Sequence, residues 1–167
     1  LCFMVTDAIG ASMFAERLEQ LRQRALARWS QTPGLHLYGN PSAKQVLPIF
    51  SFGVADGAGG TVHQQLVTRI LSDHFGIQAR GGCACAGPYA HRLLGIDADQ
   101  SKAMRGAILA GREIEKPGWT RLGFSVLMSD EKADRIISAV DAIARAPQDY
   151  IQGYTVDEST ARFSPAA

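Results

Sequence analysis

The sequence has no excess of either charge and no long apolar run. Its 17 Lys and Arg residues balance 16 Asp and Glu residues, which leaves a formal net charge of +1. Binding to nucleic acid or to an anionic membrane usually requires a basic surface, and a membrane-spanning helix needs about 20 consecutive apolar residues. The sequence therefore indicates neither a nucleic-acid partner nor a membrane partner.

Cysteine is also scarce. The chain contains three cysteines, and Cys83 and Cys85 are too close in sequence for an easy mutual disulfide. Metal sites more often space their cysteines by about two to four residues, so we expect no bound metal. The apolar residues 1–5 lack the basic start and the small-residue cleavage site of a signal peptide. These features indicate a reducing compartment, and we expect a cytoplasmic location.

What is present is typical of a folded domain. The chain has 167 residues, of which 46% are hydrophobic, enough for one core. We expect this domain to span residues 1–146 and a polar C-terminal tail to span 147–167, because the apolar pattern fades after Pro147. The chain begins at Leu1 in what looks like an element already under way, so we expect a longer polypeptide.

The apolar spacing predicts an α+β fold. Residues about 6–29 show a three-to-four-residue period typical of a long amphipathic helix, which we expect Thr6 or Asp7 to cap. Further helices are predicted over about 61–74, ending at Gly76, and over 88–94, 98–109 and a closing segment that Ser129 caps. Strands are predicted over 35–38, 46–54 and 119–126, with a strand or loop over 80–85. This order predicts a small antiparallel or mixed sheet covered by helices on one face and preceded by the long helix.

The segment from Phe75 to Pro88 has a composition that core packing does not explain. It reads Phe-Gly-Ile-Gln-Ala-Arg-Gly-Gly-Cys-Ala-Cys-Ala-Gly-Pro, where a buried strand would carry Val, Ile or Leu. Glycine and alanine let a ligand approach the backbone closely. Arg80 offers a planar fork of donors for a carboxylate or phosphate, and Cys85 offers a nucleophile. The segment therefore predicts the edge of a small-molecule site.

Two motifs resemble the C-terminal small domain of class V aminotransferases, and within them the cysteine desulfurases and selenocysteine lyases. In that family a helix with His is followed by Gly-Ile and then by Arg-x-Gly-x-x-Cys-Ala-x-Pro, which resembles His63, Gly76-Ile77 and the run from Arg80 to Pro88. The family's later Arg-x-Ser-x-x-x-x-Asn-Thr-x-Glu-Glu motif resembles the run from Arg121 to Lys132, with the same spacing from the arginine to the helix cap.

This resemblance implies a fold-type-I enzyme that uses pyridoxal 5′-phosphate (PLP) and acts on an amino-acid substrate. It implies that Arg80 binds the substrate α-carboxylate, that Arg121 lies near that site or braces it, and that Cys85 takes sulfur as a persulfide. Full-length family members form homodimers, and their PLP lysine belongs to an N-terminal domain of the same polypeptide. Lys44, Lys102, Lys116 and Lys132 lack the setting of that lysine. We therefore expect this chain to be incomplete for catalysis alone.

The residues leave the reaction open between a desulfurase and a transaminase or lyase in which Cys85 is structural. A non-catalytic binding or interaction module of the same fold is a further alternative.

Overall fold

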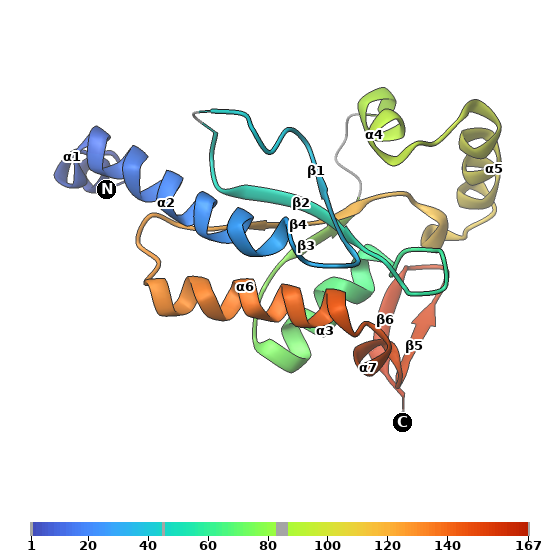
Figure 1. The fold of residues 1–167 in the computed structure, drawn as a ribbon. Coiled ribbons are helices and arrows are strands. Elements are labelled where there is room, and N and C mark those ends of the chain that lie inside the picture. The colour runs from blue at the N-terminus through green and yellow to red at the C-terminus, as the bar shows by residue number, and fades with distance from the viewer. Residues whose placement is uncertain (1, 45, 83–86, 167) are drawn as a thin grey trace.

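The computed structural model describes residues 2–44, 46–82 and 87–166 (Figure 1). Within these ranges the helices are α1 (Cys2–Ile9), α2 (Ala11–Trp29), α3 (Gln64–Phe75), α4 (Gly87–Leu94), α5 (Ala98–Leu109), α6 (Asp130–Arg145) and α7 (Gln148–Ile151), with a 3-10 turn at Glu113–Glu115. The strands are β1 (Leu35–Tyr38), β2 (Ile49–Val54), β3 (Arg80–Gly82), β4 (Trp119–Gly123), β5 (Tyr154–Asp157) and β6 (Arg162–Pro165).

The strands form two antiparallel sheets in the described part of the chain. The larger sheet has the order β1-β2-β4-β3, and β5 pairs only with β6. Strand β4 pairs with both β2 and β3, although α4 and α5 separate β3 from β4 along the chain. The predicted α+β fold with a small antiparallel sheet is thereby confirmed.

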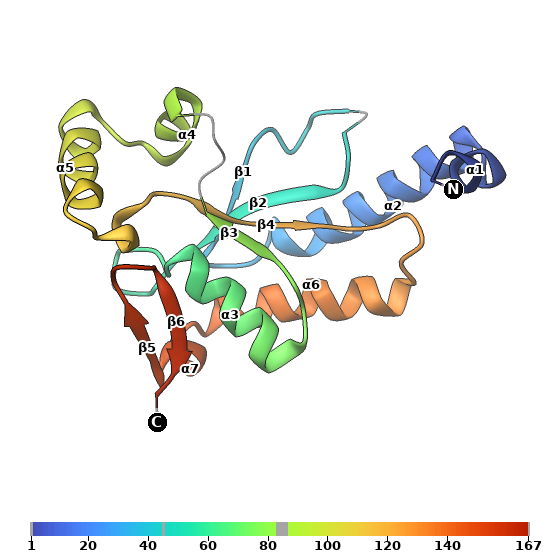
Figure 2. The same cartoon turned by 180° about the vertical axis from the view of Figure 1, so that it is seen from behind.

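Helices α2, α3 and α6 pack on one face of the larger sheet, whereas α4 and α5 lie on its other side in both views (Figures 1 and 2). Strand β2 shows why: its side chains alternate, with Phe50, Phe52 and Val54 buried and the residues between them more exposed. Trp29, at the end of α2, meets the Phe50 ring edge-on at a centroid distance of 4.8 Å. Burial of this apolar face holds the helices to the sheet.

The predicted long helix over 6–29 is wrong at its start. The structure has two helices, α1 and α2, that meet at Gly10, where φ is +82°. Glycine adopts such a positive φ without the steric cost that a Cβ would bring. Thr6 lies inside α1 and donates a hydrogen bond to the Cys2 carbonyl instead of capping a helix. The predicted end at Trp29 is correct.

The segment expected to be a polar tail has regular structure. Residues 148–165 form α7 and the β5–β6 hairpin, and Tyr154 and Phe163 pack against the core. The Tyr154 hydroxyl donates to the Asp73 carboxylate of α3 at 3.0 Å. Strands of four residues with one or two apolar anchors are too short to show a clear alternating pattern.

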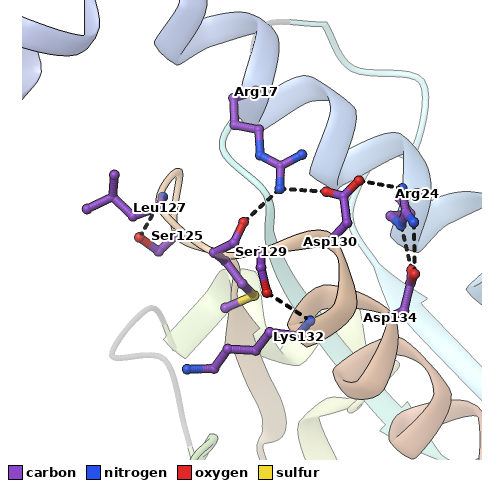
Figure 3. Close-up of polar contacts among 9 residues, drawn as sticks. Arg17, Arg24, Ser125, Leu127, Ser129, Asp130, Lys132 and Asp134 are labelled. Carbon is purple, nitrogen blue, oxygen red and sulfur yellow. Dashed lines mark hydrogen bonds and ion pairs between the residues drawn. The ribbon is translucent and has the colours of Figure 1, made fainter.

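Polar contacts fix the junction between α2 and the start of α6 (Figure 3). Arg17 donates to the Met128 carbonyl at 2.7 Å and pairs with Asp130 at 2.7 Å. The Ser129 hydroxyl caps α6 by accepting from the Lys132 amide, as predicted. Arg17 therefore ties α2 to the loop that follows β4.

Candidate functional site

Arg80 and Arg121 lie side by side on the sheet face opposite α2, α3 and α6. They are register partners of the β3–β4 pair, and so are Gly81 and Thr120. Thr120 faces α3, because its hydroxyl donates to the Gln64 carbonyl at 3.4 Å. Since side chains alternate along a strand, both arginines point to the opposite face.

Glycine at position 81 allows β3 to approach α3 closely. A Cβ on Gly81 would lie 2.8 Å from the Gln64 carbonyl oxygen, well inside normal contact. The neighbouring Gly82 has φ +127°, a conformation that L side chains rarely adopt. The glycines after Arg80 therefore serve two local purposes, the fit of β3 against α3 and the exit of the chain from β3.

The two arginines border a shallow hollow of about 350 Å³. Its lining comes from β2, β4, the start of β3 and the two residues that precede β3. It comprises Ile49, Gln78, Ala79, Arg80, Arg121, Leu122 and Gly123. A Cβ on Gly123 would lie 3.5 Å from the Ile49 side chain, so the absence of a side chain at Gly123 leaves space on this part of the sheet face. The hollow therefore has two guanidinium groups next to a small apolar surface.

The electrostatics favour an anion at this place. Both arginines are exposed, and no carboxylate of the described residues forms an ion pair with either of them. Like charges directly opposite each other on neighbouring strands destabilise a sheet. A bound carboxylate or phosphate would relieve that repulsion and could accept bidentate hydrogen bonds from a guanidinium.

The structure brings together two of the three predicted site residues. Arg80 and Arg121 are register partners. Cys85, with its neighbour Cys83, lies outside the described residues, between β3 and α4.

His63 has a structural place in the fold. It is the N-cap of α3, where Nδ1 accepts from the Gln65 amide, and its Nε2 lies 3.2 Å from the Ile114 carbonyl oxygen. Burial lowers the pKa of His63, and the contact with Ile114 opposes this shift only in part. His63 therefore caps α3 and contacts the segment that precedes β4.

Two aromatic residues on the sheet face of the arginines were not predicted from the sequence. Tyr38 and Trp119 lie with their ring centroids 5.7 Å apart. Trp119 precedes Arg121 by two positions on β4, so the alternation of that strand could have indicated a shared face.

The described lysines do not fit a covalent PLP site. Lys44, Lys102, Lys116 and Lys132 are all exposed, and Lys116 pairs with Glu113 on the surface. A lysine that carries a cofactor is instead expected in a shielded pocket that tunes its pKa.

The described ranges contain no group of three His, Cys, Asp or Glu side chains placed to hold a metal ion. No helix in the same ranges has the length and apolar character needed to span a bilayer.

Comparison with known proteins identifies the family. Residues 2–136 match the model of the class V aminotransferases, so the chain belongs to this family. No curated protein matches the chain.

One similar solved structure is the cysteine desulfurase CsdA (S-sulfonic acid) from Escherichia coli, with a TM-score of 0.46 and 20% sequence identity. The match covers 78% of this chain and 25% of that protein, so the chain spans about a quarter of its length.

Proposed function

We propose that this chain is the C-terminal domain of a PLP-dependent class V aminotransferase, and that Arg80 and Arg121 together bind the α-carboxylate of its amino-acid substrate. The observation that carries the proposal is the arginine pair, in register on the open sheet face and without a described acidic partner. Family membership supports the reaction class, because the family model matches most of the chain.

The proposal assigns the remaining parts of the site to the rest of the polypeptide. The PLP lysine would come from an N-terminal domain, since none of the described lysines fits. When bound, PLP supplies the electron sink for chemistry at the substrate's α-carbon. We further propose a cytoplasmic homodimer in which this chain forms the C-terminal domain of each subunit.

Within this family we favour a cysteine desulfurase. The sequence places Cys85 five residues after Arg80. A thiolate can attack the sulfur of a cysteine substrate, so that the S–S bond of a persulfide forms while the substrate's Cβ–S bond breaks and leaves its electron pair on the amino-acid fragment, which becomes alanine on protonation; a serine cannot store sulfur in this way. Arg80 precedes the cysteines in a run of small residues, which would leave a thiol at position 85 reachable by a substrate.

The arginine pair is tested by steady-state kinetics of the complete polypeptide. Arg80→Ala and Arg121→Ala should each raise KM for the amino acid by at least about tenfold, because each loses a charge-assisted hydrogen bond of roughly 1.5–3 kcal/mol. Arg105→Ala removes an exposed arginine of α5 and is the matched control. An unchanged KM with a lowered melting temperature would make the pair structural and contradict the proposal.

The desulfurase assignment has a separate test. In the presence of a thiol reductant, which releases the persulfide sulfur as sulfide, Cys85→Ser should abolish sulfide release from cysteine while leaving amino-acid binding intact, as measured by equilibrium titration. A serine variant that retains its rate would instead favour a transaminase or lyase in which Cys85 is structural.

A further inference from the structure

Glycine at position 123 leaves a gap in the sheet face beside the arginine pair. In the register of the sheet Gly123 pairs with Ile49 of β2, and it follows Arg121 by two positions on β4. When the β3–β4 register is continued by two residues before Arg80, Gln78 stands opposite Gly123 on the other side. Gly123 therefore lies between Ile49 and Gln78, and all three residues line the hollow of about 350 Å³ next to the arginines.

Gln78 belongs to the sheet face of the arginines. It precedes Arg80 by two positions, so the alternation of an extended chain directs both side chains to one face. Gln78 is also the diagonal neighbour of Arg121 across the β3–β4 pair, and such neighbours lie about 7–8 Å apart, within reach of long side chains. The hollow that Gln78 lines is the one that both arginines line. The Gln78 amide group can therefore approach an anion that the arginines hold.

The side-chain amide of Gln78 is available to a ligand. The side chain is exposed, and no residue in the described ranges accepts a hydrogen bond from it. Gln64 and Gln148, by contrast, each donate to a backbone carbonyl of the fold. Among the described residues, no acidic side chain lines the hollow. The NH2 group of Gln78 and the two guanidinium groups are thus donors that a bound anion can satisfy together.

We propose that the substrate carboxylate enters the gap over Gly123, and that Gln78 is a third binding residue whose side-chain NH2 group donates a hydrogen bond to the carboxylate that the two arginines hold. This inference rests on the proposed function. A carboxylate has about four lone-pair positions, so it can accept from both guanidinium groups and from one amide. Ile49 is exposed on the other side of the gap and offers an apolar contact to the atoms next to the carboxylate.

The test uses the complete polypeptide, saturated with PLP, and L-alanine, an amino acid that offers the carboxylate with a minimal side chain. Isothermal titration calorimetry gives the dissociation constant. Gln78→Ala should weaken binding about tenfold, the effect of one lost hydrogen bond to a charged group. Gln152→Ala removes an exposed amide at the end of α7 and should leave the constant unchanged.

Gln78→Glu separates a direct contact from a structural role. Glutamate has nearly the same shape as glutamine, but its carboxylate would pair with the arginines and repel the carboxylate of the ligand. We therefore expect Gln78→Glu to weaken the binding of L-alanine on the order of a hundredfold, more than Gln78→Ala does. A glutamine that served the fold through its shape alone would leave the affinity of Gln78→Glu close to that of the wild type.

Gly123→Ala tests the gap itself. The fold tolerates this change, because the new Cβ would lie 3.5 Å from the Ile49 side chain and 3.9 Å from the Pro48 carbonyl oxygen, both ordinary contacts. The melting temperature should therefore stay near the wild-type value. The methyl group would fill space that the ligand needs, so L-alanine should bind about tenfold more weakly. Gly106→Ala in α5, where a Cβ meets nothing within 4 Å, is the matched control and should bind L-alanine normally.

The outcomes distinguish this inference from the function on which it rests. If Arg121→Ala weakens binding and Gln78→Ala does not, the Gln78 contact is wrong and the arginine site stands. If Arg80→Ala and Arg121→Ala both leave binding unchanged, the carboxylate site itself is wrong. Wild-type affinity in either Gln78→Glu or Gly123→Ala would also overturn the placement of the carboxylate between Gln78 and Ile49.

Discussion

At the scale of single residues, a buried carboxylate joins α6 to the end of α2. Asp141 of α6 accepts hydrogen bonds from the Thr32 hydroxyl at 2.5 Å, from Arg28 at 2.7 Å and from Arg145 at 2.9 Å. The Asp141 side chain is only 4% exposed, whereas Arg28 and Arg145 are largely in solvent. The acceptor is therefore buried, and its cationic donors reach it from the surface.

We expect Asp141→Asn to lower the free energy of unfolding by about 2 kcal/mol. The substitution removes the negative charge of a buried group that accepts hydrogen bonds from two arginines and a hydroxyl. Asp134→Asn is the matched control on the same helix. Asp134 is 51% exposed, and its pair with Arg24 should contribute less than about 1 kcal/mol. Urea unfolding measures both variants, and equal losses would contradict the role of burial.

The same carboxylate predicts a dependence of stability on pH. Burial alone would raise the pKa of Asp141, but hydrogen bonds from Arg28, Arg145 and Thr32 outweigh burial and hold that pKa well below its usual range. The pKa of Asp141 is lower in the folded state than in the unfolded state, where it is about 3.9. The ionised carboxylate therefore stabilises the fold fully at pH values above about 3.9, and this stabilisation is lost as the pH falls further. The stability difference between wild type and Asp141→Asn should therefore be constant near neutral pH and should narrow below about pH 4. A difference that stays constant down to pH 2 would show that Asp141 stabilises through shape alone.

At the scale of elements, the fit of β3 against α3 depends on a missing side chain. A methyl group on Gly81 would lie 2.8 Å from the Gln64 carbonyl oxygen and 3.0 Å from its carbon, and both are backbone atoms that cannot rotate away. We expect Gly81→Ala to cost about 1–3 kcal/mol, the usual range for overpacking. Gly106→Ala in α5 meets nothing within 4 Å and should be neutral or stabilising by up to about 1 kcal/mol. Thermal unfolding compares the two, and similar melting temperatures would contradict the close approach of β3.

Helix ends that a single residue marks could be predicted, because that signal is local. Gly76 ends α3 in the left-handed conformation, and the Ser129 hydroxyl caps α6, as these residue types predict. The start of α2 was missed because Gly10 interrupts a continuous apolar pattern without breaking its period. Strand β2 starts at Ile49 instead of Val46, because pairing with β4 begins only there.

The candidate site also depends on how whole strands pair. The sequence identifies Arg80 from its glycine-rich surroundings, whereas Arg121 is identified only through the resemblance to the family motif. The two arginines meet because of the register in which β3 pairs with β4. That register depends on contacts between residues that are distant in sequence. Tyr38 was missed for the same reason, since its approach to Trp119 crosses a whole strand.

At the scale of the whole molecule, the C-terminal hairpin packs on α3 and on the turn before β4. Phe163 lies over the His63 ring at a centroid distance of 5.4 Å, and the Ile114 amide donates to the Glu158 carbonyl at 3.0 Å. The hairpin therefore contacts the helix that supports β3 and the segment that leads into β4. These contacts predict that the hairpin unfolds together with the main sheet, as one cooperative unit.

Phe163→Ala tests this cooperativity, and the two tryptophans of the chain report on it. Trp29 and Trp119 lie in the main body and not in the hairpin, so their fluorescence follows the core alone. Loss of the half-buried Phe163 ring should destabilise the protein by about 2 kcal/mol, less than a fully buried phenylalanine, and should lower the urea midpoint seen by the tryptophans. Val156→Ala on the same hairpin removes a side chain that is 41% exposed and should change stability by less than about 0.5 kcal/mol. A tryptophan midpoint that does not move in Phe163→Ala, while hairpin amides exchange faster with solvent, would mean that the hairpin unfolds by itself and does not stabilise the sheet that bears the arginines.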